Sequence, residues 1–190
     1  MSRAFEVDRY LIRRKFWTFM GASFHVYEGE SLLAFTRQKA FKLKEDIRVF
    51  EDEAKTKPLL TVQARQIVDF SAAYDMVDES TGTKVGAARR KGWTSILRDA
   101  WELLDADDQP VAKIIEDSQG MALVRRFVGP IMPQSFDVKD LADQRIAKLK
   151  QRFNPIIHKL EVTLEKPASI DRRLLFGAAV LISAIEGRQG

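Results

Sequence analysis

The stretch that decides the fold lies near the end of the chain and reads Leu174-Leu175-Phe176-Gly177-Ala178-Ala179-Val180-Leu181-Ile182-Ser183-Ala184-Ile185. No residue in it is charged, so a helix formed by these residues is apolar on every side. Such a helix must be surrounded by protein or by lipid. A helix that spans a bilayer needs about 20 apolar residues, and this stretch has twelve. The sequence therefore predicts a helix that is buried within the protein.

The flanking residues indicate where this helix begins and ends. Ser169 is of a type that caps helix N-termini, and Asp171 lies in the expected first turn, where a carboxylate suits the helix dipole. Gly187 follows the last apolar residue and is a typical stop signal. These signals predict a helix over residues 169–187.

Between about residues 8 and 165 the sequence has the pattern of β-strands and turns. Short runs of β-branched and aromatic residues are separated by polar, turn-forming clusters. Turns begin near Tyr27, Glu51, Asp78 and Asp105, about 24 to 27 residues apart. This spacing predicts a β-meander of about ten or more strands. The alternative is that the hairpins resemble one another only because all hairpins do. Residues 118–127 interrupt the pattern and predict a short helix.

A long meander must close on itself or leave exposed edges. A helix with its side chains is about 10 to 12 Å across, which is too wide for the interior of an eight-stranded barrel. We therefore expect a mainly β protein, in which a closed antiparallel barrel of about twelve strands surrounds the C-terminal helix. Residues 1–190 are expected to form this single domain. The helix residues expected to fill the barrel are Leu174, Phe176, Ala179, Leu181, Ile182 and Ile185.

The composition excludes several classes of protein. The chain has 190 residues, of which 45% are hydrophobic and 31% charged, no cysteine, and a formal net charge of +4. Without cysteine there are no disulfides, thiolate metal sites or cysteine nucleophiles. The small positive excess permits an anionic partner without requiring one. No apolar run of signal-peptide length occurs near the N-terminus, so we expect a cytoplasmic protein that would meet a membrane only at its surface.

The sequence offers no constellation typical of an enzyme. It has two histidines, His25 and His158, both in strand-like sequence, and it has no zinc-protease, nucleophile-elbow or P-loop spacing. The acidic residues at 51–53 and 105–108 suggest either calcium ligands or solvated turns, and their place in hairpin turns favours turns. We expect no enzymatic activity, no cofactor and no metal ligand among the residues singled out.

Basic residues occur in clusters, some of them beside aromatic residues. Alternation along a strand places Arg13 with Lys15, and Arg89 with Lys91, on common faces. Cations beside exposed aromatic side chains suit an anionic lipid surface, where each contributes about 1 kcal/mol. The alternative is that they are ordinary solvated residues on the outside of a barrel. The residues predicted to form one anion-binding edge are Arg13, Lys15, Arg89, Arg90, Lys91 and Trp93. Further clusters include Lys148, Lys150 and Arg152, and also Arg172 and Arg173.

Three stretches, taken in order, carry a resemblance to a known family. They are residues 10–17 leading to Phe24-His25-Val26-Tyr27, residues 91–93 leading to residues 98–101, and Asp171-Arg172-Arg173-Leu174 before the apolar helix. They resemble the LURP-one-related and phospholipid scramblase-like group over nearly the whole chain. The resemblance implies the tubby C-terminal fold, with twelve strands around a hydrophobic C-terminal helix.

The same resemblance implies a function in binding. Tubby domains bind phosphoinositide headgroups through basic side chains, although no residue-by-residue match to those positions can be drawn here. The chain lacks a cysteine-rich palmitoylation segment, so membrane anchoring by that route is not implied. We expect a non-enzymatic barrel that binds anionic phospholipid headgroups at the cytoplasmic membrane face. The alternatives are a nucleic-acid-binding protein and a protein-interaction scaffold.

Overall fold

The structure is a computed structural model that describes residues 2–17, 21–38, 47–65, 73–90, 100–116, 134–152, 158–166 and 169–186. Twelve strands and a C-terminal helix, α2 (Arg172–Glu186), follow a short 3-10 helix, η1 (Arg3–Phe5). The strands are β1 (Arg9–Trp17), β2 (Gly21–Glu28), β3 (Ser31–Gln38), β4 (Ile47–Phe50), β5 (Pro58–Ala64), β6 (Ala73–Asp78), β7 (Thr83–Arg90), β8 (Ala100–Leu104), β9 (Pro110–Glu116), β10 (Ser135–Asp140), β11 (Arg145–Arg152) and β12 (His158–Leu164). The predicted helix at residues 118–127 lies outside the described residues.

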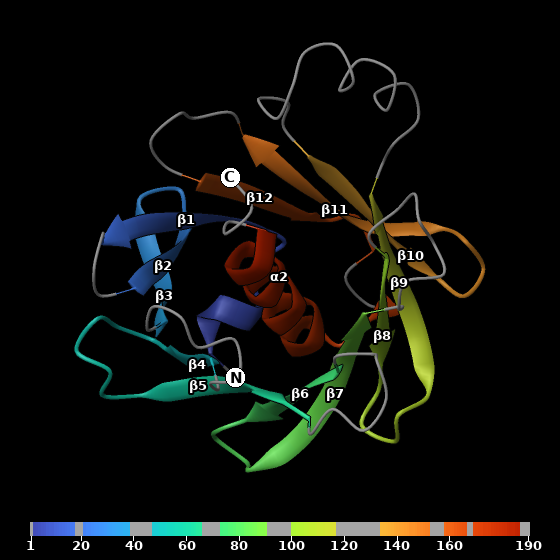
Figure 1. Ribbon diagram of the computed structural model, residues 1–190, viewed down its shortest axis with the longest axis horizontal. Coiled ribbons are helices and arrows are strands. Elements are labelled where there is room, and N and C mark those ends of the chain that lie inside the picture. Colours follow the sequence, from blue (N-terminus) through green and yellow to red (C-terminus); the bar gives the residue numbers. More distant parts are fainter. Residues whose placement is uncertain are drawn as a thin grey trace.

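The strands form one closed antiparallel barrel in which each strand pairs with its neighbours in sequence. The barrel closes where the first strand meets the last, with Arg9 opposite Thr163 and Arg14 opposite His158. Figure 1 shows the strands as a ring around α2. The prediction of a closed barrel of about twelve strands, mainly β with one central helix, is confirmed.

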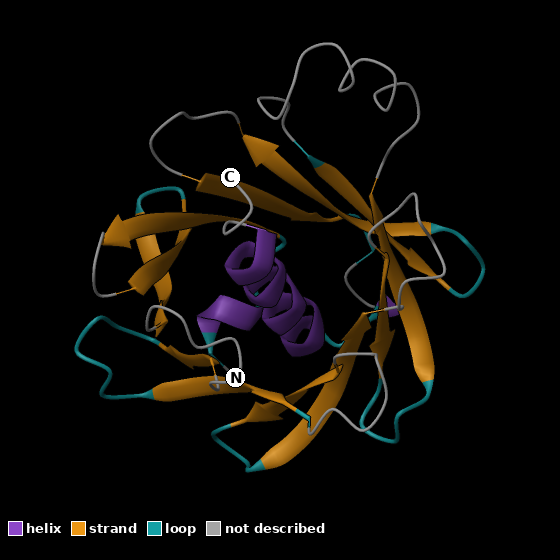
Figure 2. Ribbon diagram, viewed as in Figure 1, coloured by secondary structure: helices purple, strands orange, loops and turns teal. Residues whose placement is uncertain are grey.

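The central helix fills the barrel with the residues that the sequence predicted. Leu174, Phe176, Ala179, Leu181 and Ile182 are each at most 2% exposed, and Ile185 is partly buried against the same core. Figure 2 shows the helix enclosed by strands on all sides. None of the described helices has the length and hydropathy needed to cross a bilayer.

A glycine and several aromatic side chains complete the packing between α2 and the elements around it. A Cβ atom added at Gly177 would lie 2.7 Å from Met76 Sδ, so glycine allows β6 to approach the helix closely. The ring of Phe176 packs against Phe5 of η1 and Tyr10 of β1, with centroids 5.4 and 5.3 Å away. These contacts bind the N-terminal segment to the helix.

The helix begins later than residue 169. Its first residue is Arg172, and the Arg173 backbone N–H donates to Asp171 Oδ1 at 2.8 Å, which makes Asp171 the cap in place of Ser169. An aspartate satisfies the exposed N–H groups of a first turn as well as a serine does. Gly187, the expected stop signal, lies outside the described residues.

The described hairpin turns lie at the barrel end where α2 begins, and two of them have the same chemistry. In the β8–β9 turn the Asp105 carboxylate accepts backbone N–H groups from Asp107 and Gln109. In the β10–β11 turn Asp140 does the same with Ala142 and Gln144. The acidic residues at 105–108 thus shape a turn. Within the described ranges no group of three or more acidic or histidine side chains could hold a metal ion.

Candidate functional site

The outer surface of β11, β12 and β1 carries a concentration of positive charge. Tyr10, Ile12 and Arg14 of β1 are buried, so alternation places the residues between them outside the barrel. We call this surface the basic face. It is formed by seven cations, which are Arg9, Arg13 and Lys15 of β1, Lys159 of β12, and Lys148, Lys150 and Arg152 of β11. Arg145, at the start of β11, is also exposed, but it pairs with Glu165 and Asp137 and is not counted in the basic face.

Strand register places several of these cations directly beside one another. Arg13 lies opposite Lys159 across the barrel closure, and Lys159 lies opposite Arg152 on β11. Like charges directly opposite each other destabilise a sheet. The fold therefore holds this row at a cost, and an anion bound over the row would relieve that cost.

A single carboxylate, Glu161, lies at the centre of the described part of the basic face. Arg9 Nε donates to Glu161 Oε1 at 2.7 Å, and Arg152 Nε donates to Oε2 at 2.8 Å. Burial raises the pKa of this carboxyl, but the hydrogen bonds from Arg9 and Arg152 outweigh burial and hold the pKa below its usual range. Glu161 is therefore ionised near neutral pH, and it bridges two strands through two guanidinium groups.

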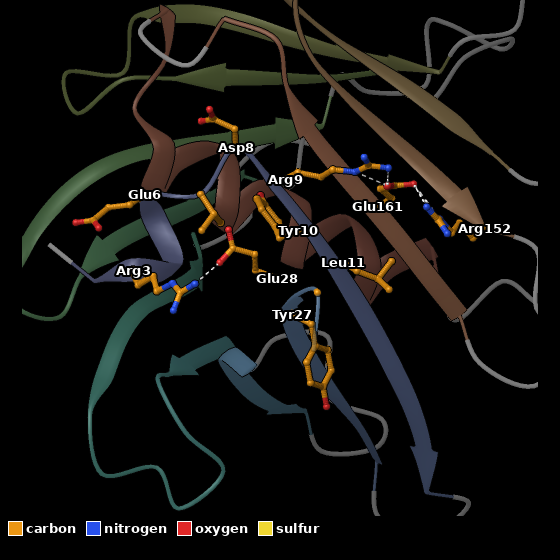
Figure 3. Close-up of a pocket in the computed structure, with 12 residues that line it drawn as sticks. Arg3, Glu6, Asp8, Arg9, Tyr10, Leu11, Tyr27, Glu28, Arg152 and Glu161 are labelled. Atoms are coloured by element: carbon orange, nitrogen blue, oxygen red, sulfur yellow. Dashed lines mark hydrogen bonds and ion pairs between the residues drawn. The ribbon is translucent and has the colours of Figure 1, made fainter. Parts of the chain in front are cut away.

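An open pocket of about 800 Å³ adjoins this end of the basic face. Figure 3 shows Glu161 between Arg9 and Arg152 on one side, and Arg3 reaching Glu28 on the other. The pocket is lined by residues of η1, the segment after it, the end of β2, and strands β1, β11 and β12. Each of its arginines is thus held by a carboxylate of the same chain.

Tyr27 of β2 gives the basic face an aromatic neighbour. The Cζ atom of Arg13 lies 4.8 Å from the centroid of the Tyr27 ring, within the range of a cation–π contact. His25 lies two residues before Tyr27 on the outer surface of β2 but is buried beneath the turn between β4 and β5. Its Nε2 lies 2.7 Å from Glu53 Oε1 of that turn. The β4–β5 turn therefore borders the basic face at β2.

The structure separates the residues that were predicted to form one anion-binding edge. Arg13 and Lys15 lie on β1, whereas Arg89 and Arg90 lie on β7, six strands away in either direction around the barrel. Figure 1 shows these strands on opposite sides of α2. Lys91 and Trp93 lie outside the described residues, as do the side chains of Phe16 and Trp17. The expected convergence of β1 and β7 is therefore wrong, because closure of a twelve-stranded barrel opposes these strands.

The two arginines of β7 also differ in their surroundings. Arg89 points outward and forms an ion pair with Glu102 of β8. Arg90 points the other way, and its Cζ lies 6.0 Å from the ring of Trp101, a side chain that is 1% exposed. Nearby outward cations are also paired, Arg65 and Lys84 with Asp108. These outward cations around β7 are therefore largely neutralised by carboxylates.

Sequence reasoning missed the connection between the two ends of the chain. It recognised Lys148, Lys150 and Arg152 as a cluster and Arg13 with Lys15 as another, but it did not join them, and it did not single out Lys159 or Glu161. The usable signal was the expectation of closure, since the last strand of a closed meander must pair with the first.

Comparison with known proteins identifies the family. No curated protein matches the chain. A family model described as LURP-one-related matches residues 32–183, which include the strands from β3 to β12 and most of α2. The match agrees with the resemblance found in the sequence and with the observed barrel. The chain belongs to the LURP-one-related family.

Proposed function

We propose that this protein binds anionic phospholipid headgroups through the basic face and acts at a membrane surface by binding alone. The observation that carries the proposal is the set of seven cations on three adjacent strands, with one carboxylate among them. The LURP-one-related family is not a known enzyme family, which agrees with a role in binding.

The charge distribution favours this wall over the opposite one. On β7 the outward Arg89 and Lys84 each have a carboxylate partner. On the basic face Lys15 and Lys150 are exposed, and each has a further cation two residues away on the same face of its own strand, Arg13 for Lys15 and Lys148 for Lys150. A lipid surface contributes about 1 kcal/mol for each basic residue near it. Four such contacts correspond to about millimolar binding, which is weak and reversible.

Lipid is favoured over single-stranded nucleic acid by the side chains available. Proteins that bind single strands combine a basic groove with several aromatic rings on which bases stack. Among the described side chains around the basic face, Tyr10 is buried and Tyr27 is covered by Arg13. The described side chains of this face thus offer cations for phosphates but few exposed rings for bases.

Vesicle co-sedimentation tests the proposal. The protein is expected to bind phosphatidylcholine vesicles that contain phosphatidylserine and not those of phosphatidylcholine alone. Lys15→Glu and Lys150→Glu each change two units of charge, so each should weaken binding by about 2 kcal/mol, or about thirtyfold. Arg48→Glu is the matched control, because Arg48 is an exposed cation on β4, outside the basic face.

Two results would contradict the proposal. One is equal binding, or no binding, to the neutral and the anionic vesicles at low salt. The other is the same loss of binding for Arg48→Glu as for the two variants of the basic face, which would point to net charge in place of a site. Binding of single-stranded oligonucleotide in preference to anionic vesicles would favour the nucleic-acid alternative.

A further inference from the structure

We infer that Glu161 occupies a phosphate-binding position between Arg9 and Arg152, and that an anionic ligand binds there by displacing its carboxylate. The inference rests on the proposed function, because it names the subsite and the internal competitor within the basic face.

The geometry is that of an anion held by two guanidinium groups. Arg9 donates to Glu161 Oε1 through both Nε and Nη2. Arg152 donates to Glu161 Oε2 through Nε at 2.8 Å, and its Nη2 forms an ion pair with the same oxygen, also at 2.8 Å. Each carboxylate oxygen thus has its own arginine. A phosphate group with two unesterified oxygens presents the same arrangement of acceptors to the same two forks.

The guanidinium groups are accessible to a ligand although the carboxylate is not. The side chains of Arg9 and Arg152 are 67% and 53% exposed, whereas that of Glu161 is 14% exposed. A phosphate can therefore approach both arginines from solvent before the carboxylate leaves. Ion pairs with exposed partners are weak in water, so exchanging one anion for another is feasible at this position.

The residues around Glu161 provide positive charge and open space for a phosphate to replace its carboxylate. Glu161 lies opposite Lys150 on one side and Leu11 on the other, and Lys159 precedes it by two residues on the same face. All three members of the cluster also line the open pocket that Tyr27 and Leu11 border (Figure 3). Asp8 lines the same pocket, but its carboxylate is already paired with Arg172 at 2.6 Å.

Glu161→Gln tests the inference because it keeps the size of the side chain and removes its charge. This variant should bind inorganic phosphate about tenfold more tightly than the unchanged protein. The measurement is a phosphate titration followed by the NMR signals of the arginine Nε–H groups. Glu165→Gln is the matched control, since Glu165 follows the same strand and pairs with a single arginine, Arg145.

The outcomes separate this inference from the proposed function. A gain for Glu161→Gln but not for Glu165→Gln supports it, and adding Arg152→Gln to the first variant should remove the gain. Equal gains in both variants, or none in either, would overturn it. If anionic vesicles bind the unchanged protein while Glu161→Gln gains nothing, only the inference fails. If Glu161→Gln gains phosphate affinity while no variant binds vesicles, the inference stands and the membrane role fails.

Discussion

At the scale of single residues, Gly86 of β7 shows how closely the wall surrounds the helix. Its φ is +151°, and a Cβ atom there would lie 2.3 Å from the Leu104 carbonyl oxygen and 3.0 Å from Leu174 of α2. We expect Gly86→Ala to lower the free energy of unfolding by about 2 to 4 kcal/mol, from backbone strain and overpacking together.

Gly82 provides the comparison for that variant. Its φ is also positive, at +68°, but a Cβ atom there has no neighbour within 4 Å. Gly82→Ala should therefore cost only about 1 kcal/mol, from the left-handed conformation alone. Urea denaturation of the two variants measures the difference, and equal losses would show that space beside Gly86 is not limiting.

His158 makes stability depend on pH. Burial lowers the pKa of its imidazole, and the positive charge of Arg14, which lies opposite it on β1, lowers the pKa further. The unfolded chain, with a histidine pKa of about 6.5, therefore takes up this proton first as the pH falls. Stability contributed by neutral His158 is present above that value and is lost below it.

The predicted result is a decrease in the free energy of unfolding between pH 7 and pH 5 that becomes smaller in His158→Gln. Denaturant titrations of both proteins across this range measure it. The same decrease in the variant would contradict the role of His158. Carboxylates with a lowered pKa, such as Asp78 and Asp108, lose their contribution to stability only below about pH 5.

At the scale of elements, α2 is the interior of the barrel. Ile182 is 2% exposed, whereas Ile185 lies one turn later and is only partly buried. Ile182→Ala should cost about 2 to 5 kcal/mol through lost transfer energy and a cavity, and Ile185→Ala clearly less. Ala179→Asp should prevent folding, because an unpaired carboxylate in a dry interior costs about as much as the domain's whole stability.

Thermal and urea unfolding of these variants measure the contribution of the helix. A chain shortened to end at Pro167 gives a harder test, since the strands would then enclose an empty interior, and we expect it to be insoluble or molten. A soluble chain of this length that unfolds cooperatively would contradict the structural role of α2.

The elements were largely predictable because their signals are local. An uncharged run of twelve residues and the alternation of the strands require only the sequence, and both the helix and the barrel are confirmed. The start of the helix was less predictable, because Ser169 and Asp171 are both good capping residues. The choice between them depends on which side chain meets the first turn, as Asp171 does with Arg173.

At the scale of the whole molecule, the candidate site depends on closure of the barrel. Alternation showed that Arg13 and Lys15 share a face. Which strand pairs with β1, however, depends on how the whole barrel closes, and alternation within one strand does not show this. Pairing of β1 with β12 brings Arg13 to Lys159 and, through it, to Arg152. The same closure opposes β1 to β7, which is why Arg89 lies on a different wall. Glu161 can bind Arg9 and Arg152 only when both β1 and β11 pair with β12.

The measurement that tests the account most directly places a fluorescent label on each wall of the barrel. The chain has no cysteine, so a single introduced cysteine is labelled without background. Thr163 lies on the basic face between Arg9 and Lys148, and Gln63 is exposed on β5, so the two variants are Thr163→Cys and Gln63→Cys. With vesicles that contain phosphatidylserine and a quencher lipid, we predict strong quenching at residue 163 and little at residue 63. Equal quenching at both residues, or quenching at residue 63 alone, would contradict the assignment of the basic face as the membrane-binding surface.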